Sequence, residues 1–92
     1  MRVVYTRHFV RMFEGCGKTE QQMIYNAVEE TLKYITSGQA AHGLRIKKLH
    51  KRIYEARVTI ALRLAYFKEN DTIKFFCVGN HDDIARSLKR QM

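Results

Sequence analysis

Two arginines and one histidine are the residues of this sequence best suited to chemistry on a phosphate. Arg57 and Arg63 lie in a stretch of alternating apolar and polar residues, and His81 stands beside Asp82 and Asp83 where an apolar run ends. Guanidinium groups stabilise negative charge on phosphate oxygens, and an imidazole exchanges protons near neutral pH. These groups suit metal-free RNA cleavage, in which the 2′-hydroxyl attacks the adjacent phosphate. His81, kept cationic by a neighbouring carboxylate, would protonate the leaving 5′-oxygen.

The cationic residues are concentrated in the middle of the chain. The 92 residues include 17 Lys and Arg against 9 Asp and Glu, a formal net charge of +8. No acidic residue occurs between Thr31 and Tyr54. Such a segment attracts phosphates or an acidic partner protein, and it is also compatible with a basic surface of no specific function. The residues to which we assign RNA contacts are Arg45, Lys47, Lys48, Lys51 and Asp82.

Other kinds of site have weak support. Neither cysteine belongs to a CxxC motif, and Gly15-Cys16-Gly17 is not part of a phosphate-binding loop. The histidines, which have no metal-ligand spacing, are His8, His42, His50 and His81. We therefore expect no metal and no cofactor. No apolar run approaches the roughly 18 residues of a membrane span, and two unpaired cysteines are typical of a reducing cytoplasm.

Apolar periodicity predicts that the chain begins with a strand and a helical hairpin. Residues 3–5 form a short apolar run, and residues 6–13 carry apolar side chains on one helical face. Apolar residues recur at three- and four-residue steps over 18–37, which predicts a long helix. The residues expected to begin or end these helices are Thr6, Thr19 with Gln22, and Gly38.

The second half of the chain is typical of a sheet. Residues 44–47 alternate apolar and basic, and 48–52 are a polar connection. Alternation resumes at Tyr54 and continues to Ile60, which we expect to point inward close to a turn. Residues 72–78 are apolar on both faces and so predict a central strand.

A last helix completes one α+β domain that spans residues 1–92. Asp82 or Asp83 offers an N-cap for a helix over 84–90. The predicted order is β-α-α-β-β-β-α, an antiparallel-dominated sheet packed by an N-terminal helical hairpin and a short C-terminal helix. We expect these helices to cover one face of the sheet.

A turn near Ile60 would place Arg57 and Arg63 opposite each other on one face of an antiparallel pair. Two guanidinium groups repel unless an anion or a carboxylate such as Glu55 lies between them. Two interpretations follow. Either the arginines bind an RNA phosphate, or Arg57 pairs with Glu55 or a helix carboxylate and His81 is an exposed loop residue.

At these residues the chain resembles the RelE/ParE superfamily of bacterial and archaeal toxins, the small basic halves of type II toxin–antitoxin pairs. The resemblance extends from Val3 to Lys89. It rests on the order of elements and on two motifs, Arg63-Leu64-Ala65-Tyr66 in a strand and Val78-Gly79-Asn80-His81-Asp82-Asp83 after the last strand.

The resemblance implies a RelE-like fold and an endoribonuclease that cleaves mRNA on the ribosome. It implies that Arg63 holds the scissile phosphate, that Arg57 is a basic catalytic residue, and that His81 is the general acid. Glu55 stands where RelE itself has a lysine, and no tyrosine follows His81. We include Glu55 among the catalytic candidates, and the identity of the general base stays open.

The resemblance also implies a cognate acidic antitoxin whose disordered tail folds on the basic cluster, and a toxin–antitoxin heterotetramer in the cytoplasm. Two other functions stay open. One is ParE-type inhibition of DNA gyrase, and the other is a catalytically inactive module that binds only its antitoxin or nucleic acid. The combination of Arg57, Arg63 and His81 favours the ribonuclease.

Overall fold

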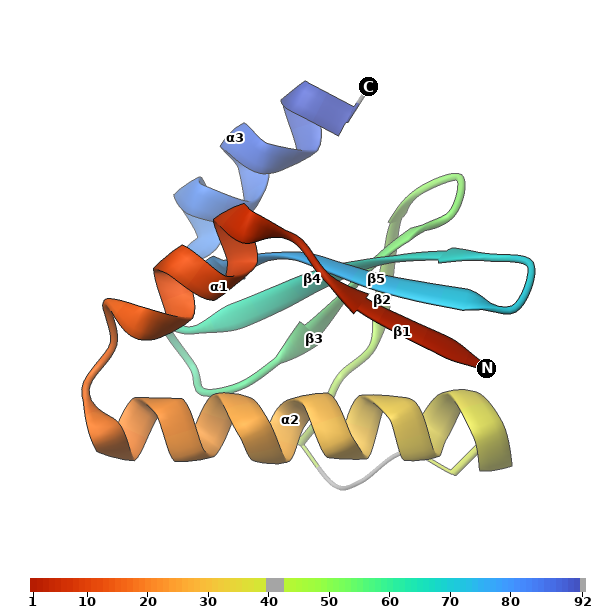
Figure 1. Cartoon of the computed structure of the whole chain (residues 1–92), viewed down its shortest axis with the longest axis horizontal. Coiled ribbons are helices and arrows are strands. Elements are labelled where there is room, and N and C mark those ends of the chain that lie inside the picture. The colour runs from red at the N-terminus through yellow and green to blue at the C-terminus, as the bar shows by residue number, and fades with distance from the viewer. Residues whose placement is uncertain (40–42, 92) are drawn as a thin grey trace.

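The computed structural model describes residues 1–39 and 43–91, which form three helices and one five-stranded sheet (Figure 1). The elements in chain order are β1 (Arg2–Tyr5), α1 (Arg7–Glu14), α2 (Lys18–Ser37), β2 (Lys47–His50), β3 (Ile53–Arg57), β4 (Arg63–Glu69), β5 (Thr72–Gly79) and α3 (His81–Gln91). The predicted α+β class is confirmed, with four strands after α2 where the predicted order has three. None of the helices in the described ranges is both long enough and apolar enough to cross a membrane.

The sheet has the strand order β1-β5-β4-β3-β2. Strand β1 runs parallel to β5, with Val3 opposite Ile73, and the other neighbouring pairs are antiparallel. Strand β5 is therefore internal, as its apolar residues on both faces predicted. Strand β4 occupies the centre of the sheet and places Arg63 beside the last residue of β3.

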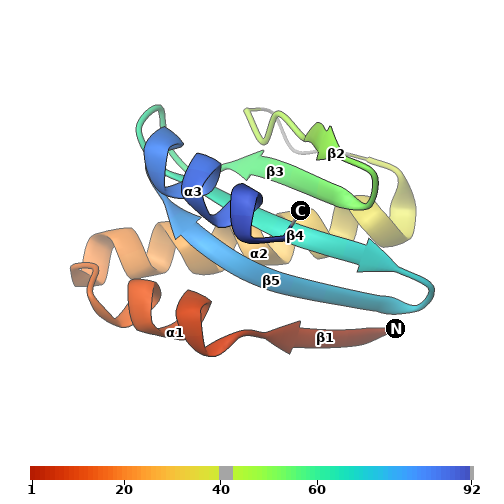
Figure 2. The same ribbon diagram turned by 90° about the horizontal axis from the view of Figure 1, so that it is seen from above.

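Helices α2 and α3 cover opposite faces of the sheet, which corrects the expectation that all helices pack on one face (Figure 2). Ile24 of α2 packs in a cluster with Leu64 and other strand residues, whereas Ile84 of α3 packs in a second cluster with Ala65. Successive residues of a strand point to opposite faces. Because β4 and β5 are apolar on both faces, each face needs a helix to exclude water from it.

Strand β2 begins at Lys47 rather than at Leu44, and residues 48–50 belong to it instead of to a connection. Arg45 has a positive φ of 45°, which interrupts any extended strand before Lys47. Leu44 is nevertheless buried, and its carbonyl oxygen accepts a hydrogen bond of 2.7 Å from the Arg57 N–H. The alternation over 44–47 thus reflects a loop packed on the end of β3.

The β3–β4 connection turns at Ile60, as predicted, but Ile60 points outward with 86% of its surface exposed. The Val58 and Thr59 N–H groups both donate to the carbonyl oxygen of Leu62, and the Leu62 N–H donates to the Thr59 hydroxyl. These bonds close a tight turn over residues 58–62 and leave Ile60 at its exposed tip. The inward prediction for Ile60 is therefore wrong.

For helices α1 and α2, two predicted boundaries are confirmed and one is wrong. The Thr6 hydroxyl caps α1, and Gly38 ends α2 in the left-handed conformation, with φ of 79°. Helix α2 is preceded by Gly17 and has no side-chain cap. Because the helix begins at Lys18, Thr19 already lies in its first turn, and the predicted capping pair of Thr19 and Gln22 does not form.

Candidate active site

Six residues from β2, β3, β4 and the loop before β2 surround a cleft of about 310 Å³. We call it the arginine cleft, and its lining residues are Arg45, Ile46, Lys47, Glu55, Arg57 and Arg63. Five of the nine residues assigned to the site from the sequence meet here. Ile46 was not predicted; its position between two cations was the only signal that could have identified it.

Strand register explains why these side chains converge. Lys47 is opposite Glu55 across β2 and β3, and Arg57 is opposite Arg63 across β3 and β4. Glu55 and Arg57 are two residues apart on β3 and so share a face. That face is the one covered by α3, because Ala65, the partner of Glu55, packs in the cluster of Ile84.

An ion pair lies at the floor of the arginine cleft. Arg63 Nη1 donates to Glu55 Oε2 over 3.1 Å. Only 7% of the Glu55 side chain is exposed, and 25% of the Arg63 side chain. The expectation that Glu55 would lie against the arginine pair is confirmed, but its partner is Arg63 and not Arg57. Among the ion pairs of the described residues, none involves Arg57.

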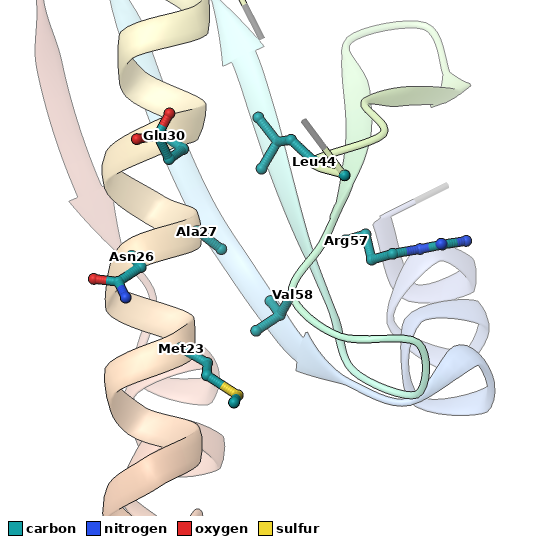
Figure 3. Close-up of a pocket in the computed structure, with 8 residues that line it drawn as sticks. Met23, Asn26, Ala27, Glu30, Leu44, Arg57 and Val58 are labelled. Carbon is teal, nitrogen blue, oxygen red and sulfur yellow. The ribbon is translucent and has the colours of Figure 1, made fainter. Parts of the chain in front are cut away.

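The guanidinium of Arg57 extends away from helix α2. A neighbouring pocket of about 330 Å³ lies between α2 and the loop at Leu44. Figure 3 shows that the Arg57 side chain points away from α2 and from the other residues that line this pocket. The backbone N–H of Arg57 is fixed by the carbonyl of Leu44. Arg57 is therefore positioned by the loop before β2 and directs its charge to the α3 side of the sheet.

His81 is the first residue of α3; it is exposed and does not line the arginine cleft. It follows Gly79 by two residues, and Gly79 is the β5 partner of Arg63. The histidine and the arginine therefore stand at the same end of the sheet. The sequence placed His81 after a strand in a loop, whereas it begins a helix.

The carboxylate of Asp83 forms its hydrogen bonds and its ion pair with residues other than His81. Asp83 Oδ2 accepts from the Asn80 N–H over 2.9 Å, while the Asp83 N–H donates to Asn80 Oδ1 over 2.9 Å. Asp83 also pairs with Arg86. This reciprocal pair makes Asn80 the cap of α3, which corrects the prediction of a cap on Asp82 or Asp83. Asp82 is exposed.

The predicted RNA-binding residues do not lie together. Arg45 and Lys47 line the arginine cleft. Lys48 is opposite Tyr54, which packs against the α2 cluster, so Lys48 is on the other face of the sheet. Lys51 is in the turn between β2 and β3, at the end of the sheet far from Arg63.

The histidines and the two thiols lie apart from the arginine cleft in the part of the chain that the structure describes. No group of three potential metal ligands occurs there, and His42 lies outside it. Cys77 is buried, and burial raises the pKa of its thiol, although a hydrogen bond from the Ser87 hydroxyl acts in the opposite direction. A protonated thiol is a poor nucleophile.

The sequence matches no family model and no curated protein at a significant level. The structure, in contrast, is similar to several solved ones. A YoeB/ParE toxin from Agrobacterium tumefaciens superposes with a TM-score of 0.67 at 16% identity, over 88% of this chain and 99% of that chain. A chain of the RelB–RelE antitoxin–toxin complex from Methanococcus jannaschii superposes with a TM-score of 0.67 at 20% identity, over 91% of this chain and 96% of that chain.

A chain of the DinJ–YafQ complex from E. coli gives a TM-score of 0.64 at 17% identity, over 89% of this chain and 96% of that chain. All three similarities extend over nearly the full length of both chains, so they concern the whole sheet and its helices. At these identities the similarity establishes the fold alone. The fold of this chain is the RelE-like fold of these toxin structures.

Proposed function

We propose that this protein is the toxin of a type II toxin–antitoxin pair and that it cleaves mRNA without a metal. The observation that carries the proposal is the arginine cleft, in which Arg57, Arg63 and Lys47 surround the carboxylate of Glu55. A cationic pocket that contains one carboxylate supplies both a phosphate site and a proton acceptor. The RelE-like fold adds support, because the solved structures with this fold include toxins and toxin–antitoxin complexes.

In the proposed reaction the scissile phosphate binds in the arginine cleft. Glu55 accepts the proton of the 2′-hydroxyl, and the 2′-oxygen forms a bond to phosphorus. Arg57 and Arg63 stabilise the charge that develops on the phosphorane oxygens. The bond between phosphorus and the 5′-oxygen breaks, and His81 donates a proton to that oxygen. The products are a 2′,3′-cyclic phosphate and a 5′-hydroxyl.

Phosphate binding and the Glu55–Arg63 ion pair compete for the same guanidinium. Arg63 already has a carboxylate partner at 3.1 Å, while Arg57 has none among the described ion pairs. We infer that Arg57 binds the incoming phosphate first and that Arg63 then shares its donors between phosphate and Glu55. A guanidinium has five N–H donors, so it can serve both anions.

His81 acts in this scheme from outside the cleft. It is exposed at the start of α3, while Arg63 pairs with Gly79 at the same end of the sheet. An RNA strand whose phosphate lies in the cleft must leave the cleft on both sides. We place the nucleotide that carries the leaving 5′-oxygen on the side of α3, where the imidazole of His81 can donate a proton to that oxygen.

The proposed protein partner is an acidic antitoxin. RelE of Methanococcus jannaschii forms a complex with RelB, and YafQ of E. coli forms one with DinJ. For this chain, the net charge of +8 and the exposed cations Arg45 and Lys47 support an acidic segment that folds on the cleft. A toxin–antitoxin heterotetramer stays a prediction. Charge reversal of Lys47 and Lys48 together should weaken antitoxin binding, and unchanged affinity would contradict the electrostatic part.

The test is inducible expression in a bacterial host of the wild type, Arg63→Ala, His81→Ala and the control Arg11→Ala. Arg11 is an exposed arginine of α1 and is not part of the cleft. Growth is followed together with primer extension on a translated message. We expect growth arrest and new RNA ends with the wild type and Arg11→Ala, and neither with the other two variants.

Other outcomes identify the alternatives. Growth arrest with an intact message would contradict RNA cleavage and point to inhibition of DNA gyrase. No growth arrest by any variant would indicate a module that only binds its partner. Circular dichroism of the purified variants shows whether a loss of activity is a loss of fold.

A further inference from the structure

A second pocket, of about 280 Å³, opens at the β4–β5 hairpin. We call it the hairpin pocket, and its lining residues are Phe67, Glu69, Asn70, Thr72 and Lys74. Phe67 belongs to the cluster under α3, so its ring is on the same face of the sheet as the arginine cleft. Helix α3 does not extend over this end of the sheet (Figure 2).

The hairpin pocket combines an accessible aromatic ring with a cation. Phe67 is only partly buried, and the ammonium of Lys74 lies 5.3 Å from the centre of its ring. The two residues are partners across β4 and β5. Aromatic rings next to cations are the usual binding elements for single-stranded nucleic acids, because bases stack on the ring and phosphates meet the cation.

Strand β4 connects the hairpin pocket to the arginine cleft. Arg63, Ala65 and Phe67 are alternate residues of β4 and so point to one face. At the usual rise per residue, Arg63 and Phe67 are separated by roughly 13 Å along the strand. Ala65, which lies between them on the same face, has a small side chain that does not obstruct the path between the two sites. One RNA strand along β4 can therefore contact both sites.

Lys51, which is remote from the arginine cleft, is close to the hairpin pocket. It is in the turn before β3, and Ile53 at the start of β3 is opposite Phe67. The adjacent Arg52 pairs with Glu69 over 3.2 Å, and its carbonyl accepts from the Lys68 N–H. Lys51 in the β2–β3 turn therefore adds positive charge to that of Lys74 at this end of the sheet.

We propose that the hairpin pocket binds a nucleobase of the single-stranded RNA whose scissile phosphate is in the arginine cleft. The base takes the place of the Lys74 ammonium on the Phe67 ring, and Lys74 and Lys51 then contact the flanking phosphates. Asn70 and Thr72 also line the pocket and offer an amide and a hydroxyl to the edge of the base, whereas Glu69 is paired with Arg52. This inference rests on the proposed function, since it extends the path of the same substrate.

The test measures RNA binding without cleavage. A short mixed-sequence RNA with 2′-O-methyl groups cannot react, and its affinity is measured for the wild type, Phe67→Leu and Tyr25→Leu. Tyr25 is an exposed aromatic residue of α2 and serves as the matched control. Leucine keeps an apolar side chain at Phe67, so the sheet stays folded. We expect about tenfold weaker binding by Phe67→Leu, with no change for Tyr25→Leu.

NMR gives a second measurement that does not depend on a variant. The ring resonances of Phe67 in the wild type should shift during titration with the same RNA. Equal affinity of the wild type and Phe67→Leu, unshifted Phe67 resonances or no RNA binding at all would overturn the proposal. If Phe67→Leu instead weakens only antitoxin binding, the pocket is a protein-docking site and the proposal is wrong.

Failure of the proposed base site can be distinguished from failure of the proposed ribonuclease function. Expression of Phe67→Leu beside the wild type shows the RNA ends that each produces. Cleavage by both at the same sites and with the same efficiency would overturn the base site and leave the ribonuclease in place. Binding that depends on Phe67 without any cleavage by the wild type would support the base site and contradict the ribonuclease.

Discussion

Arg63 donates a hydrogen bond of 3.1 Å to a carboxylate, Glu55, that is almost inaccessible to solvent. The pair joins neighbouring strands β3 and β4 on the face where the proposed substrate binds. Removal of either partner leaves the other charge partly buried without compensation. The same contact therefore bears on stability and on the proposed reaction.

Glu55→Gln should lower the free energy of unfolding by about 1–3 kcal/mol, because a charge-assisted hydrogen bond in a partly buried site is lost. Glu69→Gln is the matched control. Its ion pair with Arg52 has nearly the same length, 3.2 Å, but both side chains are largely exposed, so we expect a change below about 1 kcal/mol. Urea denaturation of both variants makes the comparison. Equal effects would show that the Glu55–Arg63 pair contributes no more than a surface pair.

Lys47→Ala should weaken RNA binding by about fivefold, as expected for the loss of one phosphate contact. It should also make the slope of the logarithm of the binding constant against the logarithm of the salt concentration less steep by about one unit. Lys48→Ala should change neither quantity. The two lysines are adjacent in the sequence, but only Lys47 lines the arginine cleft. Affinity measured at several salt concentrations distinguishes them. Similar losses for both variants would indicate a diffuse electrostatic surface.

Gly79→Ala should destabilise the protein by about 1 kcal/mol or more, because it disrupts the cap of α3. A Cβ atom at Gly79 would lie 2.7 Å from the Cβ of Asp83. Asp83 cannot move away without losing its bond to the Asn80 N–H. Thermal unfolding of Gly79→Ala and Gly17→Ala provides the comparison, since a Cβ at Gly17 meets no atom within 4 Å. A smaller effect at Gly79 than at Gly17 would contradict this account.

Stability should fall as the pH rises above the range in which an unfolded thiol ionises, about pH 8.5. Burial raises the pKa of Cys77, so the folded state keeps the thiol protonated while the unfolded chain releases its proton. The contribution of Cys77 is therefore complete below that pH and is lost above it. Urea midpoints measured on both sides of this pH should differ less for Cys77→Ala than for the wild type. An identical pH dependence in the two proteins would be inconsistent with a buried neutral thiol.

Much of the fold could be predicted because its elements have strong local signals. The long helix over 18–37 repeats its apolar residues at helical spacing, and its bounds agree with α2. A turn at Ile60 predicted that Arg57 and Arg63 are cross-strand partners, and the pairing of β3 with β4 confirms it. These features depend on periodicity within one element or between two adjacent strands.

The features that could not be predicted depend on contacts between distant elements. Which face α3 would cover is decided by the apolar residues on both faces of β4 and β5, and no local pattern in 81–91 specifies it. Lys47 and Lys48 could not be separated until β2 was placed, because a shift of one residue exchanges the two faces. The cap of α3 could not be predicted from Asp82 or Asp83 as single residues, because Asn80 and Asp83 form it as a pair.

The parallel pairing of β1 with β5 has a consequence for how the protein is made. Strand β1 is synthesised before the other strands of the sheet, and its partner β5 is synthesised after all of them. During synthesis β1 therefore has no partner, and the sheet cannot be completed on that side until β5 has been made. Premature termination before Thr72 removes the strand that connects β1 to β4. A chain that ends before Thr72 would lack a continuous sheet, because β1 would have no strand through which to join β4.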